Sequence, residues 1–254
     1  MMNATAPEPA SLIAALRDPA CRQLVAALVL NDVRLGDLAL EAALPQAEVA
    51  ALLEPLCAAG VLIDRPSDAN AQDVYYHLDL DALRSVYQAA GAPVPTELDP
   101  VEEARVCSDE RTKAPRVLFL CTRNSARSQL AEGITRLLSK GQVDVFSAGT
   151  QPGVLHPMAI DVLTSLNVDV SRQHSKHLEI FLGQSFDYVI TVCDNAGETC
   201  PVFPGAKRTI HWSIPDPAGV EDAVERGRAF RQAAMELQNR IRYLLIAIER
   251  ERSE

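Results

Sequence analysis

The chain has 254 residues, of which 48% are hydrophobic and 23% charged, a composition typical of a globular protein long enough for two domains. The net charge of −10 argues against a general nucleic-acid binder, and the apolar runs are too short to span a bilayer. The N-terminus lacks the pattern of a secretory signal, so we expect a cytoplasmic protein without membrane contact. Because that compartment keeps thiols reduced, we expect the six cysteines to be free, catalytic or redox-active.

The N-terminal part shows a run of short helical patterns followed by two β-prone segments. Apolar residues at helical spacing predict helices over residues 12–16, 21–29, 35–39 and 47–59. Residues 61–63 and 74–78 are β-prone and flank a polar stretch, which predicts a two-stranded wing. This order resembles the ArsR-type winged helix-turn-helix fold, so we expect residues 1–92 to form a mainly α winged-helix domain.

The expected recognition helix of this domain argues against DNA binding. Residues 45–56 contain two carboxylates but no Lys, Arg, His, Ser or Thr, and the wing offers only Arg65. Residues 33–40 also lack the cysteine pair of many arsenic-sensing repressors, and Cys21 and Cys57 lie on apolar helix faces, as core residues do. We therefore expect DNA binding to be weak or lost, and the domain to serve dimerisation or docking.

Residues 93–114 are rich in proline and charge and predict a linker, with Cys107 as an exposed bystander. After Pro115 the pattern alternates between strands and helices. Strands are predicted over residues 117–120, 143–148, 188–192 and 209–212, and helices over 129–139, 157–167, 174–182 and 221–251. We therefore expect residues 115–254 to form an α/β domain with a four-stranded parallel sheet flanked by helices. Its sites should lie at the carboxyl ends of the strands.

The segment Cys121-Thr122-Arg123-Asn124-Ser125-Ala126-Arg127-Ser128 follows the first of these strands and precedes a helix. Its length allows backbone N–H groups and the Arg127 guanidinium to surround one tetrahedral oxyanion, with Cys121 at the bottom of the loop. The helix N-terminus and Arg127 should favour the thiolate form of Cys121. We therefore expect Cys121 to be a nucleophile.

Three further residues near the ends of later strands carry reactive groups. Cys193 follows the third strand, and Cys200 lies seven positions further on, in a segment whose Gly and Asn allow a change of conformation. Asp216 precedes Pro217 after the fourth strand. Taken singly, Cys193 is also consistent with a buried structural cysteine, and Asp216 with a turn former.

Together these motifs resemble those of the thioredoxin-coupled arsenate reductases built on the low-molecular-weight tyrosine phosphatase fold. The resemblance covers residues 115–250 and implies arsenate reduction for detoxification. It implies an arsenate adduct on Cys121, a Cys121–Cys193 disulfide as arsenite leaves, and a final Cys193–Cys200 disulfide. It further implies Asp216 as general acid, and Thr122, Arg123, Asn124, Ser125, Ala126, Arg127 and Ser128 as the oxyanion-binding residues.

Two other functions remain open from the sequence. A low-molecular-weight protein tyrosine phosphatase would need Cys121, Arg127 and Asp216 but neither Cys193 nor Cys200. An arsenic-responsive transcriptional regulator would use the C-terminal half as its sensor. We expect no bound cofactor or metal, arsenate as substrate with phosphate or sulfate competing, thioredoxin or another thiol as reductant, and a homodimer through the winged helix.

One departure from the family concerns a cation. Some members hold potassium near residues that match Asn124, Glu132 and Ser147, together with an acidic residue that an ungapped placement matches to Lys176. The sequence therefore predicts that the Lys176 ammonium replaces the ion and that activity does not depend on potassium.

Overall fold

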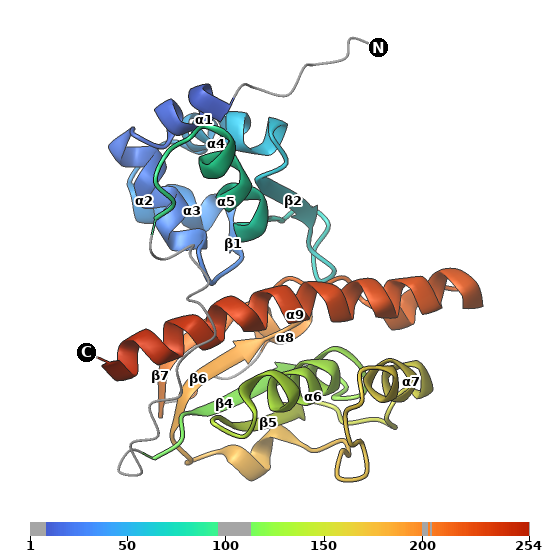
Figure 1. Cartoon of the computed structure of the whole chain (residues 1–254). Helices are drawn as coiled ribbons and strands as arrows, with labels where there is room; N and C mark the ends of the chain where they lie inside the picture. The colour runs from blue at the N-terminus through green and yellow to red at the C-terminus, as the bar shows by residue number, and fades with distance from the viewer. Residues whose placement is uncertain (1–8, 96–112, 200–202, 204, 254) are drawn as a thin grey trace. The chain divides into compact units, whose positions relative to one another are not determined.

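The structure is a computed structural model that describes residues 9–95, 113–199, 203 and 205–253. The chain divides into two compact units, residues 1–101 and 102–254 (Figure 1). Cys107 and Cys200 lie outside the described residues, as does most of the predicted linker.

The first unit combines short helices with a small antiparallel sheet. The sheet has the order β1-β3-β2, and residues Leu62–Leu78 form the predicted hairpin, with Leu62 paired to Leu78. The two-residue strand β1 was not predicted, because it is too short to show a periodicity. In chain order the elements are α1 (Pro9–Ala15), α2 (Pro19–Leu28), β1 (Val33–Arg34), α3 (Leu35–Ala42), α4 (Gln46–Ala58), β2 (Leu62–Pro66), β3 (Val74–Leu78) and α5 (Leu80–Ala89).

Local signals explain the helix boundaries in this unit. The Asp18 carboxylate accepts hydrogen bonds from the backbone N–H groups of Ala20 and Cys21 and so caps α2. Gly60 follows Ala59, the residue that caps the end of α4, and adopts a φ of 67°, a conformation that favours glycine. Cys21 is buried, as predicted for a core residue, whereas Cys57 is only half-buried. Burial raises the pKa of both thiols.

The second unit is built on a parallel sheet with the order β5-β4-β6-β7 (Figure 1). Its strands are β4 (Arg116–Cys121), β5 (Asp144–Gly149), β6 (Phe186–Thr191) and β7 (Ala206–His211). Its helices are α6 (Arg127–Ser139), α7 (Pro157–Ser165), α8 (Asp194–Thr199) and α9 (Ala223–Ser253), with 3₁₀ turns at Leu178–Phe181 and Pro217–Gly219. The predicted four-stranded parallel α/β sheet is therefore confirmed.

Side chains alternate between the two faces of the sheet along β4. Leu118 and Leu120 belong to a cluster that includes Phe181 and Phe186. Phe119 points the other way, and its ring centroid lies 5.8 Å from that of Trp212. All three β4 residues are essentially fully buried. A strand that is buried on both faces has a continuous apolar sequence, and residues 117–120 show this pattern.

The long helix α9 closes the second unit and packs against α6 and α7. Phe230, Leu237 and Ile241 are fully buried on it, whereas Met235 is exposed. Despite its 31 residues, α9 carries too many charges to qualify as a membrane span, and no other helix in the described parts of the chain qualifies.

The helix predicted over residues 174–182 is wrong. Residues 174–177 are not helical, and His177 forms an isolated parallel bridge with Gly149 at the end of β5. The Gly149 N–H donates to the Lys176 carbonyl at 2.9 Å. Only Leu178–Phe181 form a single 3₁₀ turn. Pairing with a strand edge thus overrides the apolar spacing that suggested a helix.

Candidate active site

The loop of residues 122–126 joins β4 to α6 and turns its carbonyl groups outward. The Gln151 N–H donates to Thr122 O at 2.8 Å, the Gly153 N–H to Arg123 O at 2.9 Å, and the His156 N–H to Ser125 O at 2.9 Å. Because C=O and N–H point in opposite directions across a trans peptide, the N–H groups that follow these carbonyls point inward. The loop therefore forms an anion-binding cradle at the N-terminus of α6.

Gly149, the last residue of β5, permits this loop to lie close to the sheet. A Cβ atom at position 149 would lie 2.6 Å from Thr122 O and 2.8 Å from Asn124 N. Both contacts are to backbone atoms, which cannot rotate away. The position therefore requires glycine, and the geometry of the cradle depends on it.

The Cys121 sulfur lies at the base of the cradle, and the side chain is buried. Its Sγ atom lies 2.9 Å from Ser128 Oγ, and the Asn124 N–H donates to it at 3.1 Å. Ser128 also accepts from Asn124 Nδ2 at 2.9 Å, which fixes its hydroxyl. These contacts hold the sulfur in place at the base of the loop.

Arg127 and Asp216 meet at the rim of the cradle. The two side chains form an ion pair, with Arg127 Nη2 3.4 Å from Asp216 Oδ1. Arg127 Nη1 also donates a hydrogen bond to Ile214 O at 2.8 Å. The Asp216 side chain is 45% exposed and also caps the following 3₁₀ turn through the Ala218 N–H. The guanidinium is thus held beside the loop, and the carboxyl group remains accessible from solvent.

Cys193 lies beside Cys121 at the neighbouring strand end. The Val192 N–H donates to Leu120 O at 2.8 Å, and Cys193 Sγ lies 3.5 Å from Thr122 Oγ1. Cys193 is fully buried, and burial, together with the charge of Cys121, raises the pKa of its thiol. Arg127, the Thr122 hydroxyl and the Ala196 N–H oppose that shift. The net effect favours the protonated form of the Cys193 thiol.

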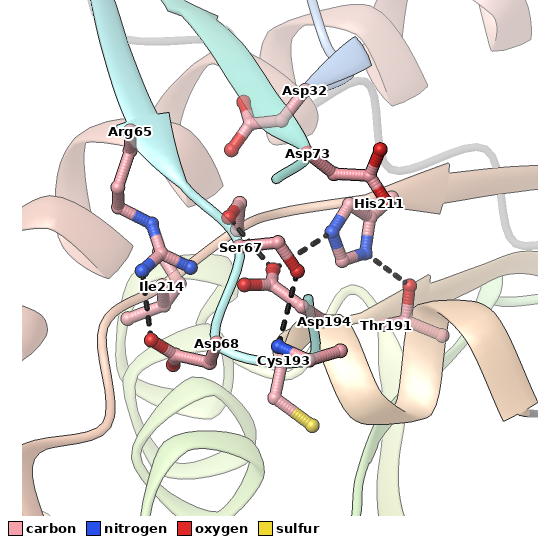
Figure 2. A network of polar contacts seen from close by, with 12 residues as sticks. Asp32, Arg65, Ser67, Asp68, Asp73, Thr191, Cys193, Asp194, His211 and Ile214 are labelled. Atoms are coloured by element: carbon pink, nitrogen blue, oxygen red, sulfur yellow. Dashed lines mark hydrogen bonds and ion pairs between the residues drawn. The ribbon is translucent and has the colours of Figure 1, made fainter. Parts of the chain in front are cut away.

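A polar cluster lies directly behind Cys193. Figure 2 shows the His211 ring between Thr191 and Asp194: Nδ1 lies 2.8 Å from Thr191 Oγ1, and Nε2 lies 3.2 Å from Asp194 Oδ1. Ser213 Oγ donates to the same Asp194 oxygen at 2.7 Å. Asp194 is fully buried and begins α8.

A second polar cluster supports the loop from below. Glu132 is 2% exposed and accepts hydrogen bonds from Ser147 and from Arg136. The Lys176 ammonium lies 3.4 Å from Glu132 Oε2. Asn124 connects this cluster to the loop, because its Nδ2 donates to Ser147 Oγ at 2.8 Å and its Oδ1 accepts from the Lys176 N–H at 2.8 Å.

The structure brings together four of the five residues predicted for the chemistry. Cys121, Arg127, Cys193 and Asp216 all converge at the carboxyl end of the sheet. Cys200 lies outside the described residues. In the described part of the chain, no group of three or more His, Cys, Asp or Glu residues is arranged to hold a metal ion.

Several supporting residues had no signal in the sequence. His156 bonds to the loop through its backbone N–H, and its ring stacks on Phe230 with centroids 4.6 Å apart. Burial and the Arg226 charge lower the pKa of His156, and Asp216 opposes this. Ser175 Oγ donates to Asn124 O at 2.6 Å. These contacts join segments far apart in the chain, so spacing alone could not reveal them.

Comparisons with known proteins agree with this geometry. Residues 116–254 match the family described as low molecular weight phosphotyrosine protein phosphatase. An arsenate reductase of Halalkalibacterium halodurans is 36% identical over 127 residues, covering 50% of this chain and 91% of the relative. An arsenate reductase of Shouchella clausii is 35% identical over 127 residues, with the same coverage. A solved thioredoxin-dependent arsenate reductase of Corynebacterium glutamicum is 28% identical, covers 56% of this chain and 65% of its own, and superposes with a TM-score of 0.44.

Proposed function

We propose that this chain, which belongs to the low molecular weight phosphotyrosine protein phosphatase family, reduces arsenate to arsenite. The single observation that carries this proposal is the position of Cys193, buried beside Cys121 and linked to it through Thr122. Hydrolysis of a phosphate ester needs one nucleophilic sulfur, whereas reduction needs a second thiol within reach of the first. The curated relatives named arsenate reductase support the same conclusion.

In the first step the cradle binds arsenate and Cys121 attacks it. The inward N–H groups of residues 123, 124 and 126 and the Arg127 guanidinium hold the oxyanion. The Cys121 thiolate forms a bond to arsenic while an As–O bond breaks. Asp216, as general acid, gives its proton to the departing oxygen, which leaves as water. The result is a covalent adduct between Cys121 and arsenic(V).

In the second step Cys193 attacks the Cys121 sulfur. A sulfur–sulfur bond forms and the sulfur–arsenic bond breaks. Its electron pair remains on arsenic, which leaves as arsenite, while the two sulfurs are together oxidised by two electrons. The Cys193 proton passes to solvent. The Arg127 charge, the Thr122 hydroxyl and the Ala196 N–H assist because each favours the Cys193 thiolate.

In the third step Cys200 attacks Cys193 and releases Cys121 as a thiolate. A disulfide requires Cα atoms about 4.4–6.8 Å apart. An α-helix separates residues seven positions apart by roughly 10 Å. Because α8 occupies residues 194–199, we propose that it unwinds when the Cys193–Cys200 disulfide forms. Unwinding would also expose the disulfide to its reductant, for which we propose thioredoxin, with another thiol as the alternative donor.

For the first unit we propose a winged helix, within the boundaries 1–92 for this domain, 93–114 for the linker and 115–254 for the catalytic domain. Support comes from the four helices that precede the β2–β3 hairpin and from its antiparallel pairing with β1. The exposed start of α4 carries Glu48 and no cation. We therefore propose that this domain serves dimerisation or docking rather than DNA binding. A redox cycle of free thiols also favours a cytoplasmic location.

The central experiment is arsenate-dependent NADPH oxidation with thioredoxin and thioredoxin reductase. We expect turnover by the wild type and its loss in the Cys121→Ser, Cys193→Ser and Cys200→Ser variants. A Cys21→Ser variant is the matched control, because Cys21 is a core residue of the other unit. Turnover in the Cys193→Ser variant would contradict the proposed relay.

An assay with an aryl phosphate separates reductase from phosphatase. Hydrolysis needs Cys121 and Arg127 but not the relay, so Cys193→Ser should abolish arsenate reduction and leave any hydrolysis intact. A wild type that hydrolyses phosphate esters and never consumes NADPH with arsenate would instead be a phosphatase.

A further inference from the structure

We propose that Asp194, His211 and Ser213 form a clamp that positions Cys193 for attack on Cys121; this inference deepens the proposed function and rests on it. The Asp194 clamp, as we call these three residues, joins the start of α8 to the last residue of β7 and to the segment that follows β7. Both partners contact the same oxygen of Asp194 (Figure 2). His211 Nε2 lies 3.2 Å from Asp194 Oδ1, and Ser213 Oγ donates a hydrogen bond to it at 2.7 Å. Cys193 immediately precedes Asp194, so the clamp fixes the backbone that carries the attacking sulfur.

The orientation of the His211 ring is itself fixed. Nδ1 lies 2.8 Å from Thr191 Oγ1, and Thr191 is the last residue of β6, two positions before Cys193. Thr191 is paired with His211 in the β6–β7 register. The ring therefore ties both sides of Cys193, Thr191 before it and Asp194 after it, to one side chain on β7.

The first turn of α8 also packs against this ring. A Cβ atom at position 197 would lie 2.7 Å from His211 Nδ1 and 2.8 Å from Cε1, so Gly197 allows the turn to approach the imidazole. The Gly197 N–H donates to Cys193 O at 2.9 Å and closes the turn. The start of α8 is thus held by the side chains of His211 and Ser213.

The relay explains why one end of α8 needs an anchor. Cys193 must meet Cys121 across neighbouring strand ends, yet the remainder of α8 must unwind before Cys200 can reach Cys193. An anchor at Asp194 keeps Cys193 in place while residues further along move. Errors of about 1 Å in such a placement cost up to 100-fold in rate. Asp194 does not touch the reacting atoms, so it is a positioning residue.

The test measures how well Cys193 is placed and needs no arsenate. In a full-length Cys200→Ser background, Cys121 and Cys193 are equilibrated with glutathione buffers and the disulfide is quantified by peptide mass spectrometry. Glutathione disulfide accepts two electrons and two protons from the thiol pair and becomes two glutathione thiols. The equilibrium gives the effective concentration of Cys193 relative to Cys121.

We expect Asp194→Ala to lower that effective concentration at least tenfold, which corresponds to about 30 mV in the potential of the pair. Asp194→Asn should remain within threefold of the parent, because the amide oxygen still accepts from Ser213 and His211. Glu179→Ala is the matched control, since Glu179 also pairs with a histidine, His177, at 3.5 Å, but at an exposed site. It should not change the equilibrium.

Each outcome decides the proposal. An unchanged effective concentration in Asp194→Ala overturns the clamp. If Asp194→Asn lowers the effective concentration as much as Asp194→Ala does, the charge of Asp194 and not its positioning of Cys193 is responsible, and the clamp is again overturned. Binding of inorganic phosphate to the loop of residues 122–126 shows whether each variant still folds correctly. If Asp194→Ala loses phosphate binding, Ser213→Ala decides: a loss of threefold or more with phosphate binding intact supports the clamp, and no loss overturns it. A wild type that reduces no arsenate would end the proposed function but leave this titration interpretable.

Discussion

The Ser128 hydroxyl lies 2.9 Å from the Cys121 sulfur, and both side chains are buried at the junction of loop and helix. Ser128 belongs to the first turn of α6, so the helix that directs its N-terminus at the anion also supplies a hydrogen-bond partner of the nucleophile. Strand, loop and helix are thereby coupled through two side chains. The nucleophile is held before any substrate binds.

Replacing Ser128 by alanine should therefore slow chemistry at Cys121. A hydrogen bond to a charged group contributes about 1.5–3 kcal/mol, so we expect a loss of roughly 10- to 100-fold in the alkylation of Cys121 by iodoacetamide at pH 7 and in arsenate turnover. Ser139→Ala on the same helix is the control. Its buried Oγ has no hydrogen-bond partner in the described part of the chain, so this change should have little effect.

Gly149→Ala should disrupt the cradle. The new Cβ would lie 2.6 Å from Thr122 O, so the loop must move away from β5. We expect phosphate binding, followed by calorimetry, to weaken more than tenfold, and the free energy of unfolding to fall by about 1–3 kcal/mol, the usual range for overpacking. Gly153→Ala provides the comparison, because a Cβ there meets nothing within 4 Å. Equal phosphate affinity in the two variants would contradict the required close approach.

The second step should accelerate as pH rises. Burial and the Cys121 charge raise the pKa of Cys193 above its ordinary value, so the thiol predominates near neutrality and the reactive thiolate increases with pH. In rapid-quench single turnovers, we expect formation of the Cys121–Cys193 disulfide to quicken steadily between pH 7 and 9. A rate that is flat over this interval would show that deprotonation of Cys193 does not limit the step.

Potassium should not stimulate the wild type. The Lys176 ammonium lies 3.4 Å from the buried Glu132 carboxylate and already supplies a positive charge beneath the loop. We expect equal turnover in sodium, potassium and choline chloride at matched ionic strength. In Lys176→Met the charge is lost, so potassium should raise the melting temperature of this variant and not that of the wild type. Marked stimulation of the wild type by potassium would refute the prediction that the Lys176 ammonium takes the place of a potassium ion.

Much of the second unit followed from the sequence alone. The buried run of residues 117–120, the turn signals and the helical spacing of residues 129–139 predicted β4, the loop and α6 in the correct order. Strand ends of a parallel sheet share one edge, so the meeting of Cys121 and Cys193 was also predictable. The helix expected at residues 174–182 failed because its backbone pairs with Gly149 at the sheet edge.

What the sequence determined by itself was the set of reactive groups and the elements that carry them. Residue types and short spacings specify a thiol between a strand and a helix, and local hydrogen bonding is enough to form both. Only the tertiary structure decided how those groups are held: Gly149 against Thr122, Ser147 between Asn124 and Glu132, and His211 against Asp194. Each of these contacts joins residues separated along the chain by at least eight positions, so no local pattern encodes it. They exist because packing of the sheet and helices buries polar groups, which must then find partners.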